Sequence, residues 1–193
     1  GVRIKNIPEF NSYLWDEKLY GNILCEGAQG FWLDINHGNY PYVTSSNTLP
    51  YGACSLGFPP QLIRRIYGAS KIYDTRSGID PLFPETLLKD NELLSLVKVG
   101  EEFGTTTGRM RKTNWLNLDK LISAVKISGT TIIIISKVDV IKKINIYKLY
   151  HNSNLLSFDT FTEMKKYINT VLKENSNLLN EIIYSDTAEL TIL

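Results

Sequence analysis

A short segment between Glu101 and Trp115 concentrates the groups that proteins use to bind anions. Its order is EEFGTTTGRMRKTNW, with three threonines between two glycines and then two arginines and a lysine. Hydroxyls and glycine-flanked backbone N–H groups donate hydrogen bonds, and guanidinium groups pair with carboxylates and phosphates. If the backbone is extended there, the side chains of Arg109 and Arg111 point to the same side. The segment is predicted to bind more than one anion, with a solvated basic turn as the less favoured alternative.

This segment does not have the pattern of the phosphate-binding P-loop. That loop requires Gly-x-x-x-x-Gly-Lys followed by Ser or Thr, and the pattern occurs nowhere in the 193 residues. Paired catalytic carboxylates, a metal-ligand cluster, a Ser-His-Asp set and a Gly-x-Ser-x-Gly turn are not recognisable either. We therefore expect no catalytic residue and no metal ligand among these residues.

A second polar segment, Ser136-Lys137-Val138-Asp139, directly follows the apolar run 130–135. A carboxylate at a strand end can accept hydrogen bonds from both the ring N–H and the amino group of guanine. A lysine stem can lie across a base while its ammonium stays in solvent. From these four residues alone, an ordinary turn with solvated charges is the favoured interpretation.

Two further turns, at residues 26–30 and 43–48, are rich in hydrogen-bond donors. The amide of Gln29 can pair with a purine or a phosphate, and the hydroxyl of Thr44 can donate to a phosphate. His37 stands alone and is interpreted as a structural histidine.

The hydrophobic pattern predicts the elements that hold these segments. Apolar residues at helical spacing predict helices over 118–127, capped by Asn117, and over 158–173. A proline pair predicts a further helix start before 61–67. The run 130–135 predicts a strand buried on both faces. Shorter strands are expected at residues 22–25, 182–183 and 190–193.

Strands that alternate with helices predict an α/β fold with a mostly parallel central sheet and flanking helices. In such sheets ligands bind at the carboxyl ends of the strands. The chain is 43% hydrophobic with a net charge of +1, which suits one globular domain and gives no global attraction to nucleic acid or to an anionic membrane. Two cysteines are too few for a disulfide framework and are expected to be buried thiols. Without a recognisable signal peptide, a cytoplasmic location is expected.

Taken together, these segments resemble the signature of the adenylosuccinate synthetase family. The run CEGAQGFWLDINHGNYPYVTSSNT from Cys25 to Thr48 is followed, in the family's order, by residues 75–78, 102–111 and 136–139. The resemblance covers residues 23–193 but only the C-terminal half of the family. It implies that residues 1–193 are the C-terminal portion of a single domain with a P-loop NTPase-like fold. The half with the phosphate loop, the catalytic aspartate and histidine and most Mg²⁺ ligands is not among these residues.

The resemblance implies a ligase that joins L-aspartate to IMP at the expense of GTP, with Mg²⁺, and that acts as a homodimer. The 6-oxygen of IMP is first phosphorylated, and the amine of aspartate then displaces that phosphate. The implied IMP contacts are Gln29, Thr44 and Arg109. The implied aspartate contacts are Thr105, Thr106, Thr107, Gly108, Arg109, Met110 and Arg111. The implied GTP contacts are Arg111, Lys137, Val138, Asp139, Tyr184, Ser185 and Asp186.

The chain departs from the family pattern at several positions. A Thr-Arg-Val-Gly-x-Gly-Pro-Phe-Pro-Thr-Glu stretch becomes TRSGIDPLFPE at residues 75–85, and Arg-Arg-Thr-Gly-Trp becomes RKTNW at 111–115. The late Ser-Thr-Gly-Pro loop that closes on the GTP base is shortened to YSDT at 184–187. Two alternatives therefore stay open: a virus-type relative that joins aspartate to dGMP with ATP, and a non-catalytic nucleotide-binding fragment. A small GTPase is disfavoured because the P-loop pattern is absent.

Overall fold

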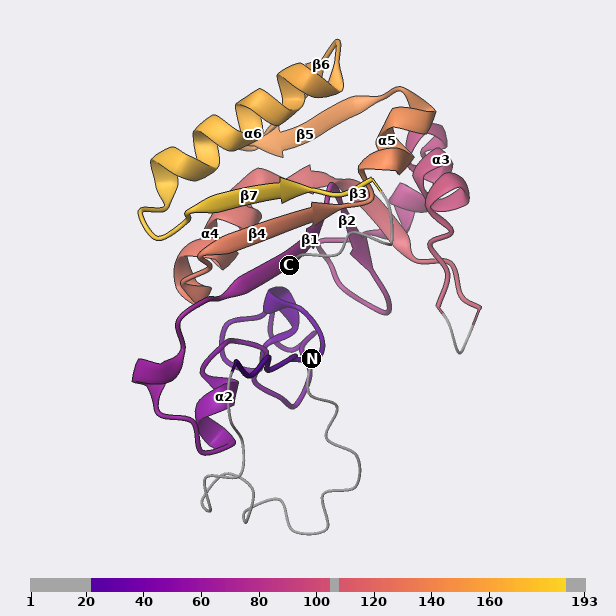
Figure 1. The fold of residues 1–193 in the computed structure, drawn as a ribbon. Helices are drawn as coiled ribbons and strands as arrows, with labels where there is room; N and C mark the ends of the chain where they lie inside the picture. Colours follow the sequence, from indigo (N-terminus) through magenta and orange to yellow (C-terminus); the bar gives the residue numbers. More distant parts are fainter. Residues whose placement is uncertain (1–21, 105–107, 187–193) are drawn as a thin grey trace. The chain divides into compact units, whose positions relative to one another are not determined.

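The computed structural model describes residues 22–104 and 108–186 (Figure 1). The chain divides between Ile66 and Tyr67 into two compact units, here called unit 1 and unit 2. Each unit is described by itself, and the single-domain expectation for residues 1–193 stays a prediction. Within the described ranges, no helix combines the length and the apolar character needed to cross a bilayer.

The described part of unit 1, residues 22–66, consists of loops and three short helices, and a buried carboxylate organises the turn after the first of them. The short helices are η1 (Phe31–Leu33), α2 (Gly52–Ser55) and η2 (Pro60–Leu62). Asp34 is fully buried and accepts hydrogen bonds from the backbone N–H groups of Asn36 (2.9 Å), His37 (3.1 Å) and Thr48 (2.6 Å). Burial opposes ionisation of Asp34, but these hydrogen bonds outweigh it and lower the pKa of the carboxyl group.

Three expectations for unit 1 are wrong. Residues 22–25 form no strand, because they are exposed and pair with no described strand. The helix expected over 61–67 is only the single turn η2, because Ile63 is already extended and Tyr67 begins a strand that pairs with unit 2's own sheet. Cys25 is exposed and Cys54 is half-buried, so neither thiol is buried as expected, although both are free.

The described residues of unit 2 form two sheets, and the strand predicted at 190–193 lies outside them. The parallel sheet has the strand order β1 (Tyr67–Lys71), β4 (Ile132–Ser136), β7 (Glu181–Tyr184), and these strands lie side by side in Figure 1. The second sheet has the order β2 (Tyr73–Arg76), β3 (Lys112–Asn117), β5 (Tyr147–His151), β6 (Asn154–Phe158), and only its β3–β5 pair is parallel. The helices are η3 (Glu85–Lys89), α3 (Asn91–Gly100), α4 (Leu118–Ser128), α5 (Val138–Ile144) and α6 (Phe161–Asn175).

Local capping explains where the longer helices begin and end. The side chain of Asn117 accepts from the N–H of Lys120, as predicted, and Gly129 ends α4 in the left-handed conformation with φ 66°. The hydroxyl of Thr160 caps α6, so this helix begins three residues later than its predicted start at 158. Helix α3, capped by Asp90, has no counterpart among the predicted elements.

Strand β4 is the centre of the parallel sheet and of the core. It pairs with β1 on one side and β7 on the other. Ile133 and Ile135 are buried whereas Ile132 and Ile134 are half-buried, so the prediction of a strand buried on both faces holds fully for one face only. Ile133 and Ile135 belong to the same buried cluster as Leu96 of α3, Val125 of α4 and Ile168 of α6. The predicted α/β fold with a parallel sheet and flanking helices is confirmed, whereas the second, mixed sheet was not foreseen.

The register of the parallel sheet brings the ends of its strands together. Lys71 at the end of β1 is paired with Ser136 at the end of β4, and Tyr184 at the end of β7 is paired with Ile135. The segments that follow β4 and β7 therefore start from one edge, where ligands of parallel α/β sheets bind.

The buried carboxylate of Asp74 in the second sheet makes the free energy of unfolding depend on pH. Among the described residues, the carboxylate of Asp74 on β2 accepts one backbone hydrogen bond, from Asn117 at 3.2 Å, and burial raises its pKa to about 6. A raised pKa means that ionisation destabilises the folded state, so the cost is present above pH 6 and disappears as the pH falls toward 4. Asp74→Asn is therefore expected to raise the free energy of unfolding at pH 8 by on the order of 2 kcal/mol.

Urea unfolding at pH 8 and pH 5 measures this difference, which should shrink at the lower pH. Asp159→Asn, at an exposed aspartate before α6, is the matched control. An equal effect of Asp74→Asn at both pH values would contradict the assignment.

Candidate functional site

The segment after β4 makes a strained turn at the carboxyl edge of the sheet. Lys137 has φ 63°, a left-handed conformation that costs free energy for a residue other than glycine, and α5 begins at the next residue. The ammonium of Lys137 donates to the carbonyl oxygen of Gly100 at 2.9 Å, at the end of α3. The expectation that this ammonium stays in solvent is therefore wrong: the lysine ties α3 to the strand-end turn.

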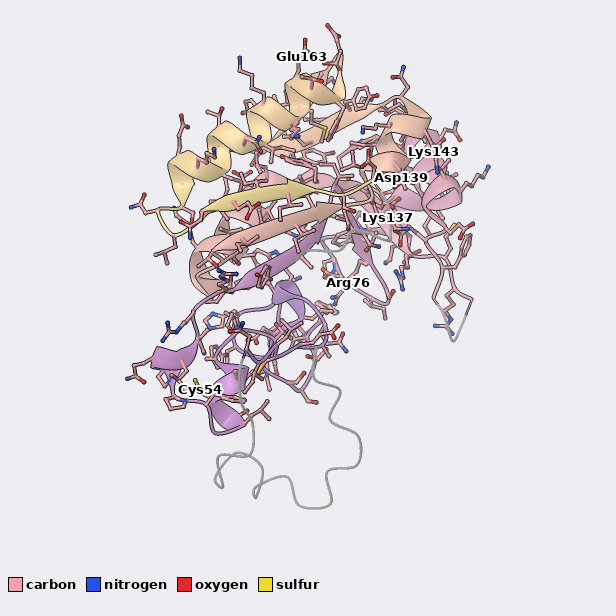
Figure 2. The ribbon with its side chains drawn as sticks, viewed as in Figure 1. Cys54, Arg76, Lys137, Asp139, Lys143 and Glu163 are labelled. Atoms are coloured by element: carbon pink, nitrogen blue, oxygen red, sulfur yellow. The ribbon has the colours of Figure 1, made fainter. Side chains whose placement is uncertain are left out.

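Asp139 lies in the first turn of α5 with its carboxylate open to solvent on one side. Its side chain is 34% exposed and forms an ion pair with Lys143, one turn later, at 3.1 Å. Figure 2 shows Lys137, Asp139 and Lys143 gathered at the end of β4. A carboxylate placed at this edge has an acceptor to offer to a ligand's N–H groups.

The end of β7 is joined to the same turn through the backbone. Ser185 donates its N–H to Ile135 at 2.9 Å, and its carbonyl oxygen accepts from the N–H of Val138 at 3.3 Å. Asp186 then forms an ion pair with Lys142 of α5 at 2.7 Å. The two segments predicted to contact one purine base, 137–139 and 184–186, are thus brought together.

The side chains in these two segments differ in what they leave for a ligand. Val138 and Ser185 are buried. The ring of Tyr184 packs against Phe161 of α6, and its hydroxyl donates to Asn169 at 3.0 Å, while burial raises its pKa. The side chains of Asp139 and Asp186, rather than that of Tyr184, are therefore the polar groups presented at this edge.

The segment predicted to bind anions, here called the anion-binding loop, is closed at its base. Phe103 and Met110 form an antiparallel bridge, and the N–H of Gly104 donates to the carbonyl of Arg109 at 2.8 Å. Gly108 has φ 62°, which favours glycine at this position. Gly108, Arg109 and Met110 are exposed, whereas the expected contacts Thr105, Thr106 and Thr107 lie outside the described residues.

A buried ionic cluster at the base of this loop was missed by the sequence analysis. Glu102, 1% exposed, accepts from the ammonium of Lys71 at 2.7 Å to both carboxylate oxygens, from the hydroxyl of Tyr73 at 2.8 Å and from Arg111 Nη1 at 3.2 Å. The sequence signal that could have indicated the cluster is Glu102 itself, because an acidic residue directly precedes a loop rich in cations. Only the fold brings Lys71 and Tyr73 to it.

The protonation of this cluster follows from its burial. Burial lowers the pKa of Lys71, although Glu102 opposes that effect, and burial with the hydrogen bond to Glu102 raises the pKa of Tyr73. For Glu102, burial is outweighed by the donors, above all Lys71 and Tyr73, and the pKa is lowered. The cluster therefore holds an ionised carboxylate facing several cations.

The predicted IMP contacts of unit 1 lie in its turns. Gln29 is exposed and has φ 71°, another left-handed residue that is not glycine. The hydroxyl of Thr44 donates to the carbonyl of Leu33 at 2.9 Å, so in this structure it supports its own loop. Arg109, the third predicted IMP contact, belongs to unit 2.

One departure from the family pattern has a structural counterpart. Asp80 stands where the pattern has a glycine, and its Oδ2 lies 3.2 Å from Nε of Arg76, which the pattern retains (Figure 2 labels Arg76). Both side chains are largely buried. At this position the chain therefore pairs Arg76, the last residue of β2, with a carboxylate.

The described residues offer no metal-binding cluster, and a groove along α6 is not lined by the predicted contacts. Among residues 22–104 and 108–186, no group of three or more His, Cys, Asp or Glu side chains is placed to hold a metal ion. A groove of about 740 Å³ runs along α6 and contains none of the predicted contacts. It is lined by lysines such as Lys165, Lys166 and Lys173 on the solvated face of a surface helix, which is an ordinary arrangement.

Comparison with known proteins agrees with the signature. The family model described as adenylosuccinate synthetase matches residues 4–170. The adenylosuccinate synthetase of Flavobacterium johnsoniae is 43% identical over 148 residues, which are 74% of this chain and 34% of that protein. That of Bacteroides thetaiotaomicron is 47% identical over 134 residues, which are 69% of this chain and 30% of that protein. The chain thus spans about a third of the length of these curated relatives.

Solved structures show the same fold. Fully ligated adenylosuccinate synthetase from Plasmodium falciparum matches with a TM-score of 0.72 and 25% identity, over 92% of this chain and 50% of that chain. A succinoaminodeoxyadenylate synthetase of cyanophage S-2L, bound to dGMP and dATP, matches with a TM-score of 0.53 and 15% identity over 81% of this chain and 41% of that chain, a likeness of fold alone. Because the family model matches residues 4–170, which are most of this chain, the chain belongs to the adenylosuccinate synthetase family.

Proposed function

We propose that this chain supplies the acceptor-nucleotide, aspartate and purine-base contacts of an adenylosuccinate synthetase. Such a ligase of purine biosynthesis joins L-aspartate to IMP with GTP as the energy donor. The observation that carries the proposal is the carboxyl edge of β1, β4 and β7, where residues 137–139 and 184–186 meet. Glu102 connects the loop 104–111 to the same edge through Lys71.

The charges at this edge suit the proposed ligands. Lys71 and Arg111 contact Glu102, and Lys137 is close enough to lower the pKa of that carboxylate further, so three cations face one anion. The positive excess favours a dicarboxylate and nucleotide phosphates. In the proposed assignment, Gly108, Met110 and Thr105–Thr107 line the aspartate, and Gln29 and Thr44 contact IMP. Arg109 contacts both, and Arg111 lies between aspartate and the phosphates of GTP.

The guanine base is assigned to the segments 137–139 and 184–186. Asp139 accepts from the ring N–H and the amino group of guanine, while Val138, Tyr184 and Ser185 shape the edge through their backbone. The stem of Lys137, whose ammonium is held by Gly100, borders the base. Asp186 is placed by Lys142 at the other side of the same turn.

Magnesium is expected from the family, but the described residues do not fit it. They contain no cluster of carboxylate, histidine or cysteine ligands that would hold the ion. We therefore assign no metal ligand to these residues and derive no step of the reaction from them. A homodimer and a cytoplasmic location remain predictions.

Two alternatives are distinguished by experiment. The shortened segment after β7 leaves dGMP as acceptor and ATP as donor as the second candidate, and a non-catalytic nucleotide-binding chain as the third. The decisive measurement is mass spectrometry of products after joining this chain to the segment of the Flavobacterium johnsoniae relative that precedes the matched residues. IMP or dGMP is supplied with GTP or ATP and aspartate. Adenylosuccinate formed from IMP and GTP is the expected product.

The 193 residues alone are expected to show no turnover. They contain no P-loop sequence, and positioning with charge stabilisation makes up most of phosphoryl-transfer catalysis. Turnover is measured as the release of phosphate when the chain is incubated with IMP, GTP and aspartate. The control is the same reaction without aspartate. Clear aspartate-dependent release of phosphate would contradict the prediction.

Replacing Arg109 by lysine tests the aspartate site in the joined protein. A lysine keeps the positive charge but loses the two-pronged pairing of guanidinium with a carboxylate. Arg109→Lys is expected to lower kcat/KM for aspartate by about 10²-fold, on the order of 3 kcal/mol. Arg64→Lys, at an exposed arginine of unit 1, is the control. Unchanged aspartate dependence would remove Arg109 from the site.

Replacing Asp139 by asparagine tests the base site. The change converts one acceptor into a donor, so the preference for GTP over ATP should fall by roughly 1–3 kcal/mol, as for one bidentate base contact. Lys143→Gln is the matched control, because it removes the 3.1 Å ion pair but leaves the carboxylate. The ratio of kcat/KM for the two donors is measured at saturating aspartate. A wild-type preference for ATP would refute the guanine assignment and favour the dGMP alternative.

A further inference from the structure

The carboxylate of Glu102 joins the two ends of the anion-binding loop. The backbone N–H of Arg111 donates to the carbonyl oxygen of Glu102 at 2.9 Å, and the guanidinium of Arg111 donates to the carboxylate of the same residue. Phe103 and Met110, the next residues inward, form a bridge. Arg111 is therefore held to Glu102 by its main chain and by its side chain.

Lys71 and Tyr73 fix Glu102 from the other side. They come from β1 and β2, so the carboxylate is anchored to both sheets of unit 2. Gly100 allows this arrangement, because a Cβ atom there would lie 2.4 Å from the hydroxyl of Tyr73, which is itself almost fully buried. A carboxylate with this many charge-assisted hydrogen bonds has little freedom to move.

Arg111 keeps donors that the cluster does not use. Its Nη1 donates to the Glu102 carboxylate, and its Nε is buried without a hydrogen-bond partner among the described residues. A buried unsatisfied N–H costs free energy unless a ligand or water completes it. The side chain is one-third exposed, so the rest of its guanidinium is accessible to an anion.

Residues 100–102 also anchor segment 137–139, which is assigned to the purine base. The carbonyl oxygen of Gly100 accepts from Lys137, while Glu102, two residues later, holds Arg111. The anion-binding loop and the turn after β4 are thus attached to one short segment, residues 100–102. Any shift of this segment moves both.

We propose that Glu102 is a positioning residue that orients the guanidinium of Arg111 for the carboxylate substrate. Glu102 itself touches no substrate, and it acts through Arg111. This inference rests on the proposed function, in which Arg111 borders aspartate and the nucleotide phosphates. Loss of the carboxylate charge leaves Arg111 free to rotate, so binding of the dicarboxylate weakens while the steps that do not involve Arg111 continue.

A double-mutant cycle in the joined protein tests the proposal. Glu102→Gln is expected to raise the Michaelis constant for aspartate about tenfold, with a smaller effect on kcat and on the Michaelis constant for IMP. In an Arg111→Met background, Glu102→Gln should have no further effect on aspartate, because the group through which it acts is gone. Glu101→Gln, at the exposed neighbouring glutamate, is the matched control and should leave all three parameters unchanged.

A milder variant guards against loss of folding. Tyr73→Phe removes one 2.8 Å hydrogen bond to Glu102 but keeps the buried ring, and it is expected to raise the aspartate Michaelis constant about threefold. Equal losses from Glu102→Gln in both Arg111 backgrounds, or equal rises in the Michaelis constants for aspartate and IMP, would overturn the positioning role.

A readout without turnover separates this inference from the proposed function. In the 193-residue chain, the Arg111 Nε–H resonance in ¹⁵N NMR spectra should shift or broaden in Glu102→Gln and Tyr73→Phe but not in Glu101→Gln. An unchanged resonance would overturn the inference even if the joined protein makes adenylosuccinate. Conversely, a joined wild-type protein without product refutes the proposed function, while the resonance still shows whether Glu102 orients Arg111.

Discussion

The hydrogen bonds and ion pairs of the Glu102 carboxylate hold together the edge of unit 2 at which we propose that ligands bind. Burying a carboxylate is costly unless donors compensate for the lost water, and here Lys71, Tyr73 and Arg111 provide them. Each donor comes from a different element: β1, β2 and the end of the anion-binding loop. The requirement to satisfy one buried charge therefore fixes the relative positions of three parts of the unit.

The same requirement explains why positive charge accumulates at this edge. Lys71, Arg111 and the nearby Lys137 all face the single carboxylate of Glu102, which suits the proposed binding of anions. The backbone at this edge is also strained, because Lys137 has a left-handed conformation in the turn after β4. Strained and charged backbone at the carboxyl end of a parallel sheet is the usual setting of a binding site in α/β proteins. A loop of exposed glycine and arginine is thereby given a rigid base.

Much of the local structure was predictable because it depends on nearest neighbours along the chain. The helix after Asn117 and the strand of isoleucines were found from capping and hydrophobic pattern, and both are close to their observed bounds. Strand β1 was missed because Tyr67 to Lys71 is not an apolar run: it becomes a strand by pairing with β4. Residues 61–67 were wrongly expected to be helical: the helical turn ends at Leu62, residues 63–66 form no regular element, and Tyr67 already pairs with β4.

The sequence by itself determined the chemical character of the site: donors, arginines and a strand-end aspartate in the order of the adenylosuccinate synthetase family. Only the tertiary structure decided which groups hold them in place. Glu102 contacts Lys71 across 31 residues of chain, and Lys137 reaches Gly100 across 37. Neither contact follows from spacing, because a hydrogen bond over such a separation requires the fold that brings its partners together, and that fold is set by burial of a core spread over the whole unit.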